Sequence, residues 1–195
     1  MKYKYIFAFD PSGNFNEGKG TSGWVLMDWN ENLLERGYIT AEQYDCAEEY
    51  WQAHVDLIYK YHKRYKNQLI IVMEDYVLYR DRSADQTNSR METCRLLGVL
   101  QYHCWRLRQP YTMQLAASVK QRWADELLCR EGILYRRGRK FIHARSGKDI
   151  SLIHTRDAFR HAIHYTVTRN KTKGKFYKPI DRDFRKSNYG ERSYE

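Results

Sequence analysis

The stretch that decides the fold is Lys4–Pro11, with the sequence KYIFAFDP. Its aromatic and β-branched residues predict a buried strand. Pro11, followed by Ser-Gly, predicts a turn directly after Asp10. An ionised carboxylate at the end of a buried strand costs free energy unless a partner compensates its charge. Asp10 therefore caps a turn, pairs with an arginine or belongs to a functional site.

A second strand of the same kind favours the functional site. Gln68–Asp75 reads QLIIVMED, another buried run that ends in acid at Glu74. If the first strand is central and this strand lies parallel beside it, Asp10 and Glu74 are neighbours at one end of the sheet. Two core strands that deliver carboxylates to the same edge indicate a metal site.

The composition fits one basic domain that binds a polyanion. The chain has 195 residues, 42% of them apolar, which is enough to bury a core. Its 34 Lys and Arg exceed its 24 Asp and Glu, for a net charge of +10. This balance favours nucleic acid over a membrane surface, because we find no basic amphipathic helix and no long apolar span.

Two further features predict a cytoplasmic protein. Asp10 interrupts the apolar start of the chain, where a secretion signal needs an unbroken apolar core. The four cysteines are far apart and form no CxxC pair, which is typical of reduced thiols rather than of a zinc site or a disulfide framework.

The remaining pattern predicts a mixed α/β domain, in which three antiparallel strands are followed by parallel strands and helices. Strands are expected at 4–11, 24–27, 33–38, 69–74 and 111–115, and helices at 41–65, about 83–107, 118–132 and 150–167. The third helix is expected to open with a capping box at Ser118–Gln121. Ile133–Lys148 is basic without clear periodicity. We expect the domain to span 1–169, followed by a flexible basic tail at 170–195.

The last predicted helix adds a third acid. His154, Asp157, His161 and His164 fall within an arc of roughly 80° on one helical face. A single histidine on such a face is ordinarily a core residue whose hydrogen bonds are satisfied. In a His-x-x-Asp pair, by contrast, both side chains can bind the same ion. Three carboxylates in a dry cleft repel one another, and one or two divalent cations remove that cost.

Carboxylates around Mg²⁺ in a basic protein indicate phosphoryl transfer. Two ions about 3.5–4 Å apart can bind both the attacking water and the leaving oxygen of a phosphodiester. No Ser-His-Asp or Cys-His nucleophile pattern competes, and no Walker-type loop is present.

Together these residues resemble the RNase H-like nucleases, and more specifically the RuvC-type Holliday junction resolvases, in a phage branch. The similarity lies in Asp10 after an apolar strand, Glu74 at the end of the fourth strand and His154-x-x-Asp157 at the start of a late helix. Ser118–Gln121 is similar to a RuvC stretch whose lysine approaches DNA. The resemblance covers roughly residues 3–167.

The resemblance implies an RNase H-like five-stranded mixed sheet and a homodimer that resolves branched DNA during recombination and repair. It implies Mg²⁺ or Mn²⁺, two ions per active site, and no small-molecule cofactor. The implied metal and catalytic residues are Asp10, Glu74, His154 and Asp157, with Lys120 assisting at the phosphate. For the dimer interface we expect the helix at about 83–107, with its apolar residues Met91, Leu96, Leu97, Val99, Leu100 and Trp105.

Basic and aromatic residues provide candidate DNA contacts, since cations hold the phosphates that carboxylates repel. The candidates are Tyr76, Tyr79, Arg80, Arg82, Arg90, Arg136, Arg137, Arg139 and Lys140. For any one arginine a solvated surface is an equal alternative, and core packing is the ordinary role of a tyrosine.

The interpretation is a metal-dependent, structure-selective DNA endonuclease that resolves four-way junctions. One rival is the same chemistry on flaps, forks or RNA–DNA hybrids. The other is a nucleic-acid-binding protein that kept the fold without turnover, although pure binding has no use for three converging acids.

Overall fold

The computed structural model describes residues 3–15, 20–77 and 91–171. Its main sheet has the strand order β3-β2-β1-β4-β5. β1 pairs antiparallel with β2 and parallel with β4, β2 pairs antiparallel with β3, and β4 pairs parallel with β5. The strands are Tyr5–Asp10 (β1), Thr21–Asp28 (β2), Leu33–Thr40 (β3), Leu69–Asp75 (β4) and Tyr111–Leu115 (β5). The predicted mixed sheet, with its first strand in the centre, is confirmed.

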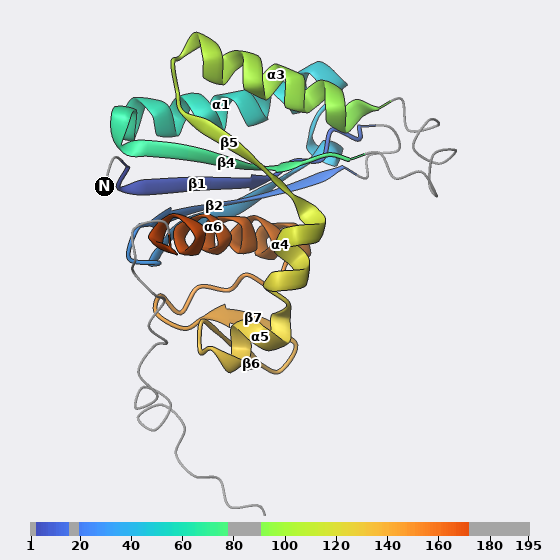
Figure 1. The fold of residues 1–195 in the computed structure, drawn as a ribbon. Coiled ribbons are helices and arrows are strands. Elements are labelled where there is room, and N and C mark those ends of the chain that lie inside the picture. Colours follow the sequence, from blue (N-terminus) through green and yellow to red (C-terminus); the bar gives the residue numbers. More distant parts are fainter. Residues whose placement is uncertain (1–2, 16–19, 78–90, 172–195) are drawn as a thin grey trace, which may run out of the picture.

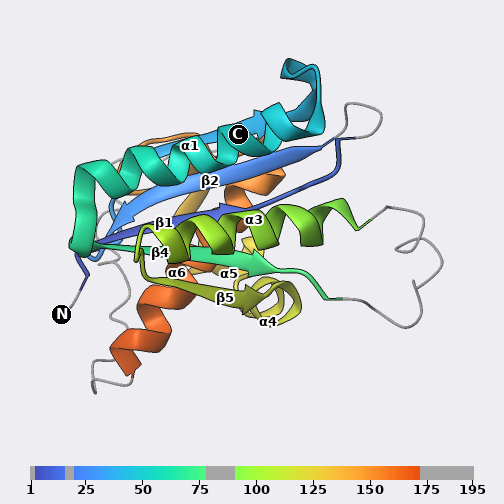
Figure 2. The same ribbon diagram turned by 90° about the horizontal axis from the view of Figure 1, so that it is seen from above.

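Helices cover both faces of the sheet. α1 and α3 lie side by side over one face (Figure 2), and α6 crosses the other face (Figure 1). A small unit of α4, α5 and the hairpin β6–β7 lies beyond α6, so that α6 is enclosed between this unit and the sheet. The bounds are Ala41–Gln43 (η2), Ala47–Tyr65 (α1), Lys66–Gln68 (η3), Glu92–Arg106 (α3), Ala116–Arg122 (α4), Asp125–Arg130 (α5), Leu134–Arg137 (β6), Lys140–His143 (β7) and Ile153–Lys171 (α6).

The two-residue alternation of β1 and β4 decides which face each carboxylate occupies. In β1, Ile6 and Ala8 pack in the core under α6, while the residues between them pack under α1 and α3. Asp10 follows Ile6 and Ala8 at a spacing of two residues, so its side chain lies on the same face of the sheet as theirs. By the same alternation, Glu74 lies on the face of β4 that packs against α6. Both acids therefore point toward α6.

A close approach at Gly23 brings the first turn of α6 onto the sheet. Gly23 pairs with Asp10 in the β1–β2 ladder. A Cβ atom on Gly23 would lie 2.1 Å from the backbone carbonyl carbon of His154, so any larger residue would push the helix away. Glycine at this position thus holds His154 and Asp157 beside the end of β1.

The observed helix starts differ from the predicted ones, and the helix predicted from residue 150 begins at Ile153. The helix predicted from Ala41 begins at Ala47, because the chain between η2 and α1 is extended. α3 begins at Glu92, because Met91 before it has a left-handed backbone with φ 53°. The predicted start at about Ser83 lies outside the described residues.

The predicted capping box at Ser118 is wrong. α4 begins at Ala116, directly after β5, and Ser118 lies inside its first turn. The single helix predicted up to Gly132 is in fact two, because the backbone leaves the helical region at Trp123 and Ala124.

Ile133–Lys148, which shows no periodicity in sequence, contains the hairpin β6–β7. Gly138 at its tip has φ +61°, a conformation that glycine adopts without strain. The predicted DNA contacts Arg136, Arg137, Arg139 and Lys140 are all exposed on this hairpin.

The last helix extends further than predicted. α6 continues to Lys171, past the expected end of the helix at residue 167, and the domain boundary at residue 169 stays a prediction. Residues from 172 onward lie outside the described residues, so the flexible tail stays a prediction. Among the residues the structure describes, no helix has the length and apolar character needed to cross a membrane.

Candidate active site

Three carboxylates from three elements meet at one edge of the sheet. Asp10 ends β1, Glu74 lies at the end of β4 and Asp157 lies near the start of α6; one oxygen of each lies within 4.8 Å of the others. Asp10 and Asp157 are only 7% and 5% exposed. The acids line a cavity of about 350 Å³, together with Pro11, Ser12, Asp75, Tyr76, Thr93, Lys120, Ile153 and His154.

Asp10 is held by His154. The imidazole Nδ1 donates to Asp10 Oδ2 at 2.9 Å. Burial raises the pKa of Asp10, and the charges of Glu74 and Asp157 raise it further, although the hydrogen bond from His154 opposes them. The same hydrogen bond raises the pKa of His154. The environment of Asp10 therefore disfavours an uncompensated negative charge and favours a nearby cation.

Glu74 is held by two donors. His161 Nε2 lies 3.0 Å from Glu74 Oε2, and Lys120 Nζ lies 3.3 Å from the same oxygen. Burial alone would raise the pKa of Glu74, but the hydrogen bond from His161 and the charge of Lys120 outweigh it and lower the pKa. Glu74 is therefore ionised beside an acid that resists ionisation.

Asp157 is held on both oxygens. Lys120 Nζ lies 3.0 Å from Asp157 Oδ2, and Arg160, one turn further along α6, pairs with Oδ1. Arg160 NH2 also lies 2.6 Å from Asp125 Oδ1 at the start of α5. This pair ties the small unit beyond α6 to the carboxylate cluster.

The donor set fits a divalent cation. The carboxylates of Asp10, Glu74 and Asp157 provide converging oxygen ligands of the kind that a divalent cation accepts. The Lys120 ammonium contacts both Glu74 and Asp157, whose charges raise its pKa although burial would lower it. Lys120 is shared between Glu74 and Asp157, and Arg160 is shared between Asp157 and Asp125, so a bound cation would add positive charge where the three carboxylates converge.

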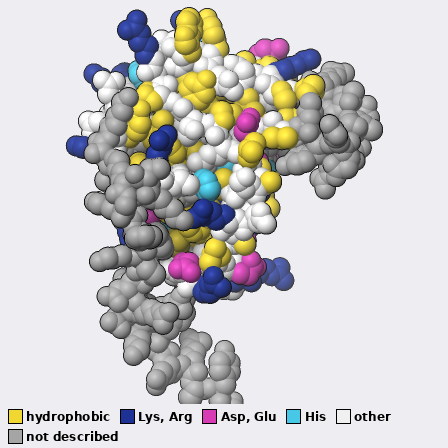
Figure 3. Space-filling view, in the orientation of Figure 1, with side chains coloured by type: hydrophobic (Ala, Val, Ile, Leu, Met, Phe, Trp, Pro, Cys, Tyr) yellow, Lys and Arg dark blue, Asp and Glu magenta, His cyan; other side chains and the backbone are white. Residues whose placement is uncertain are grey.

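The structure separates the predicted DNA contacts into three groups. Tyr76 lines the cavity of the acids. Tyr79, Arg80, Arg82 and Arg90 fall within 78–90, outside the described residues. The four hairpin cations do not line this cavity, and the Arg136 guanidinium lies 4.8 Å from the ring centroid of Phe141. In Figure 3, Lys and Arg are scattered over the visible face, at its rim, near its centre and along its lower edge, and form no single patch there.

Of the three histidines on the predicted helical face, His154 and His161 contact the acids, and His164 contacts another partner. The ring of His164 instead accepts a hydrogen bond from Trp123 Nε1 at 3.3 Å, and burial lowers its pKa. It lies one turn too far along α6 to reach the sheet edge.

Two residues that received no role from the sequence hold the acids in place. Gln114 is the direct ladder partner of Glu74 and contacts His161. Arg160 lies three residues after Asp157, a spacing that brings side chains together on a helix. The helical spacing of Arg160 was visible in the sequence, whereas the pairing of Gln114 depends on the β4–β5 register.

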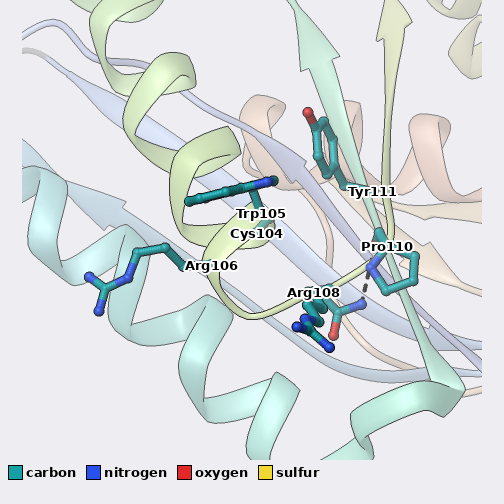
Figure 4. A pocket seen from close by; sticks show the side chains of 7 residues that line it. Cys104, Trp105, Arg106, Arg108, Pro110 and Tyr111 are labelled. Atoms are coloured by element: carbon teal, nitrogen blue, oxygen red, sulfur yellow. Dashed lines mark hydrogen bonds between the residues drawn. The ribbon is translucent and has the colours of Figure 1, made fainter.

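A second cavity, of about 670 Å³, lies far from the acids. It is formed by the end of α3 and the start of β5, where Trp105 and Tyr111 stand beside Arg108 and Pro110 (Figure 4). Tyr111 opens β5, whereas Gln114 near the carboxylates is close to its end. This cavity is therefore at the opposite end of the sheet.

Comparison with known proteins identifies the fold. Neither a family model nor a curated protein sequence matches the chain. Thermus thermophilus RuvC in complex with a Holliday junction substrate matches with a TM-score of 0.59 and 15% identity, covering 88% of this chain and 97% of that chain. The chain has the fold of RuvC. A second T. thermophilus RuvC structure gives a TM-score of 0.56 and 17% identity, covering 90% and 99% of the two chains.

The predicted resemblance to RuvC is thus confirmed for the fold. At this identity, the chemistry of the site has to be argued from its own residues. A phage origin is not tested by the likeness and stays a prediction.

Proposed function

We propose that the chain is a divalent-metal-dependent endonuclease that cuts four-way DNA junctions. The observation that carries the proposal is the convergence of Asp10, Glu74 and Asp157 at one edge of a RuvC-like sheet. A protein that only binds nucleic acid gains nothing from three converging acids, which repel phosphate. The solved complex of T. thermophilus RuvC with a Holliday junction makes that substrate the first one to test.

In this proposal Asp10, Glu74, His154 and Asp157 hold Mg²⁺ or Mn²⁺, two ions per site. The bound cations would supply positive charge at the scissile phosphate and make a water molecule more acidic. His154 orients Asp10 through Nδ1. Lys120, whose side chain is 39% exposed, donates to a phosphate oxygen from the same cavity.

We assign substrate binding to the exposed Lys and Arg side chains of the domain. The net charge of +10 and the exposed cations of the β6–β7 hairpin supply phosphate contacts, which carry affinity without sequence preference. In this proposal Tyr76, which lines the cavity, stacks on an unpaired base at the branch point. The enzyme would act on DNA in the cytoplasm, that of the host if the chain is phage-encoded.

A junction resolvase needs two symmetric nicks, so we propose a two-fold homodimer. Leu96, Leu97 and Leu100 of α3 are buried in the monomer and are not available for a partner. Trp105 is 71% exposed and stacks on Tyr102, which is 54% exposed. In Figure 3 hydrophobic side chains gather in the upper part of the face, the side on which α3 lies. The end of α3 is therefore the proposed interface.

A panel of labelled substrates tests the function. A four-way junction, a Y-fork, a flap, a linear duplex and an RNA–DNA hybrid are incubated with and without Mg²⁺, beside the Asp10→Asn variant. We expect paired, Mg²⁺-dependent nicks on the junction and none from the variant. Faster cutting of forks, flaps or hybrids would assign the same chemistry to another substrate, and metal-independent binding without cutting would contradict the nuclease.

A further inference from the structure

His161 is a fully buried histidine whose two ring nitrogens both contact polar side chains. It is 0% exposed. Its Nε2 lies 3.0 Å from Glu74 Oε2, and its Nδ1 lies 2.8 Å from Gln114 Oε1. Because a carboxylate oxygen only accepts, Nε2 donates to Glu74, and Nδ1 of the neutral ring then accepts from the Gln114 side-chain amide turned so that its NH₂ group faces the ring.

Two independent features of the fold, the β4–β5 register and the helical spacing of α6, bring the side chains of Glu74, Gln114 and His161 together. Glu74 and Gln114 are ladder partners in β4 and β5, so their side chains stand on the same face of the sheet. His161 follows Asp157 by four residues, about one turn of α6, so both residues lie on the helical face above that edge. His161 thus reaches Glu74 from the element that also carries the third acid.

We propose that His161, held by Gln114, is a positioning residue that fixes the orientation of the Glu74 carboxylate and thereby sets the affinity of the site for divalent metal. The inference rests on the proposed function only in taking Glu74 as a metal ligand. It assigns His161 no contact with the metal or the substrate.

Burial decides which partner orients Glu74. Lys120 also contacts this carboxylate, but its side chain is 39% exposed and its ammonium is shared with Asp157. His161 is enclosed on every side and is held through its second nitrogen. A hydrogen bond from an enclosed ring restricts the carboxylate more than one from a flexible chain, because the ring has no alternative rotamer to adopt. Partners of this kind typically change metal affinity by about 10–100-fold.

A matched pair of variants separates positioning from packing. The terminal amide of glutamine can place a nitrogen near the Nε2 position of histidine, whereas that of asparagine reaches only the Nδ1 position. His161→Gln therefore keeps a donor for Glu74, and His161→Asn loses it. His164→Asn, one turn further along α6 and bonded to Trp123, is the control.

The experiment measures Mn²⁺ binding to the full-length protein by calorimetry, without DNA, after thermal melting has shown that each variant is folded. We expect His161→Asn to weaken Mn²⁺ binding by about 10–100-fold. For His161→Gln and His164→Asn, the Mn²⁺ affinity should remain within about threefold of the wild-type value. Wild-type affinity in His161→Asn, or equal weakening in the Asn and Gln variants, would overturn the inference.

Gln114→Met provides a second route if His161→Asn does not fold. Methionine keeps the volume of glutamine but removes the polar contact with His161 Nδ1, and we expect about tenfold weaker Mn²⁺ binding. Unchanged affinity would overturn the inference. Because DNA is absent, loss of Mn²⁺ binding in these variants supports the role of His161 even if the wild-type protein cuts no junction, a result that would contradict the nuclease alone.

Discussion

Each end of the sheet has a cavity, and the residues that line the two cavities differ. This difference indicates which cavity is the active site. At the end of β1 and β4, a cavity of about 350 Å³ is lined by Asp75 and by the three converging acids, each of which is held by a partner from another element. At the opposite end, about 670 Å³ is lined by Trp105, Arg108 and Tyr111 without an acid. The smaller cavity is the candidate active site, because catalysis requires charged side chains held in a fixed arrangement and a large volume does not provide them.

The largest effect should come from the acids themselves. Asp10→Asn, Glu74→Gln or Asp157→Asn should each reduce junction cleavage by about 10³-fold or more, because each removes a metal-binding charge. DNA binding should survive or tighten, since less negative charge then faces the phosphates. Cleavage assays and gel shifts on the same samples measure both effects.

Arg108→Ala at the opposite cavity is the matched control for the acids, scored as the rate of the first nick because Trp105 in the same cavity belongs to the proposed dimer interface. Cleavage within about twofold of wild type is expected. An equal loss of cleavage in Arg108→Ala, or near-normal cleavage by Asp10→Asn, would reverse the assignment of the two ends.

A graded loss is expected at His154. His154→Ala should lose about 100-fold in Mg²⁺-supported cleavage, because Asp10 loses its hydrogen-bond donor and the site loses a nitrogen ligand. His154→Asp should retain part of the activity, since a carboxylate can replace imidazole as a ligand. Cleavage rates across a Mg²⁺ titration distinguish the two variants, and normal rates in His154→Ala would exclude this residue from the site.

Two glycine substitutions test whether the close approach of α6 to the sheet depends on Gly23. Gly23→Ala should destabilise the protein by about 3 kcal/mol, because a new Cβ would meet the α6 backbone at 2.1 Å. Gly98→Ala in α3 meets nothing within 4 Å and should be neutral or stabilising by up to about 1 kcal/mol. Chemical denaturation of both variants measures the difference. Equal stability would show that α6 can move off the sheet without cost.

A smaller effect is expected on acidification, through the loop that follows Asp10. His54 Nδ1 donates to the carbonyl of Tyr50 at 2.6 Å, and its Nε2 lies 2.7 Å from Ser22 Oγ, which accepts from the Ser12 amide at 2.8 Å. Burial lowers the pKa of His54 to about 4. Since the folded pKa lies below the unfolded value of about 6.5, this stability is complete above pH 6.5 and is lost as the pH falls toward 4.

Between pH 6.5 and 5 the loss at His54 should reach about 2 kcal/mol. Unfolding free energies measured across this range test the effect, with His54→Gln as the comparison. A glutamine keeps polar atoms at the site without titrating, so its pH dependence should be flatter by that amount. Parallel curves for the two proteins would contradict a buried neutral His54.

The sequence was sufficient for the features that depend on local periodicity. The apolar runs before Asp10 and Glu74 predicted β1 and β4, and the helical spacing of His154 and Asp157 predicted the start of α6. The three acids could therefore be assembled once β1 and β4 were taken as parallel neighbours.

The remaining features depend on long-range contacts that a single sequence does not contain. The role of Gln114 follows from the register of β4 and β5, and the different fate of His164 follows from how far α6 extends beyond the sheet edge. The break at Trp123 has a similar origin, since this side chain is buried in the core under α6. The predicted contacts at Tyr79, Arg80, Arg82 and Arg90 lie outside the described residues and stay predictions.

The central claim is that β1, β4 and α6 together build one divalent-metal site. Crystals soaked in Mn²⁺ and measured at a wavelength where manganese scatters anomalously test it most directly. The account predicts anomalous density among the carboxylates of Asp10, Glu74 and Asp157, and its loss in the Asp10→Asn variant. Anomalous density elsewhere on the chain with none among these three carboxylates, or density that persists unchanged in the variant, would contradict it.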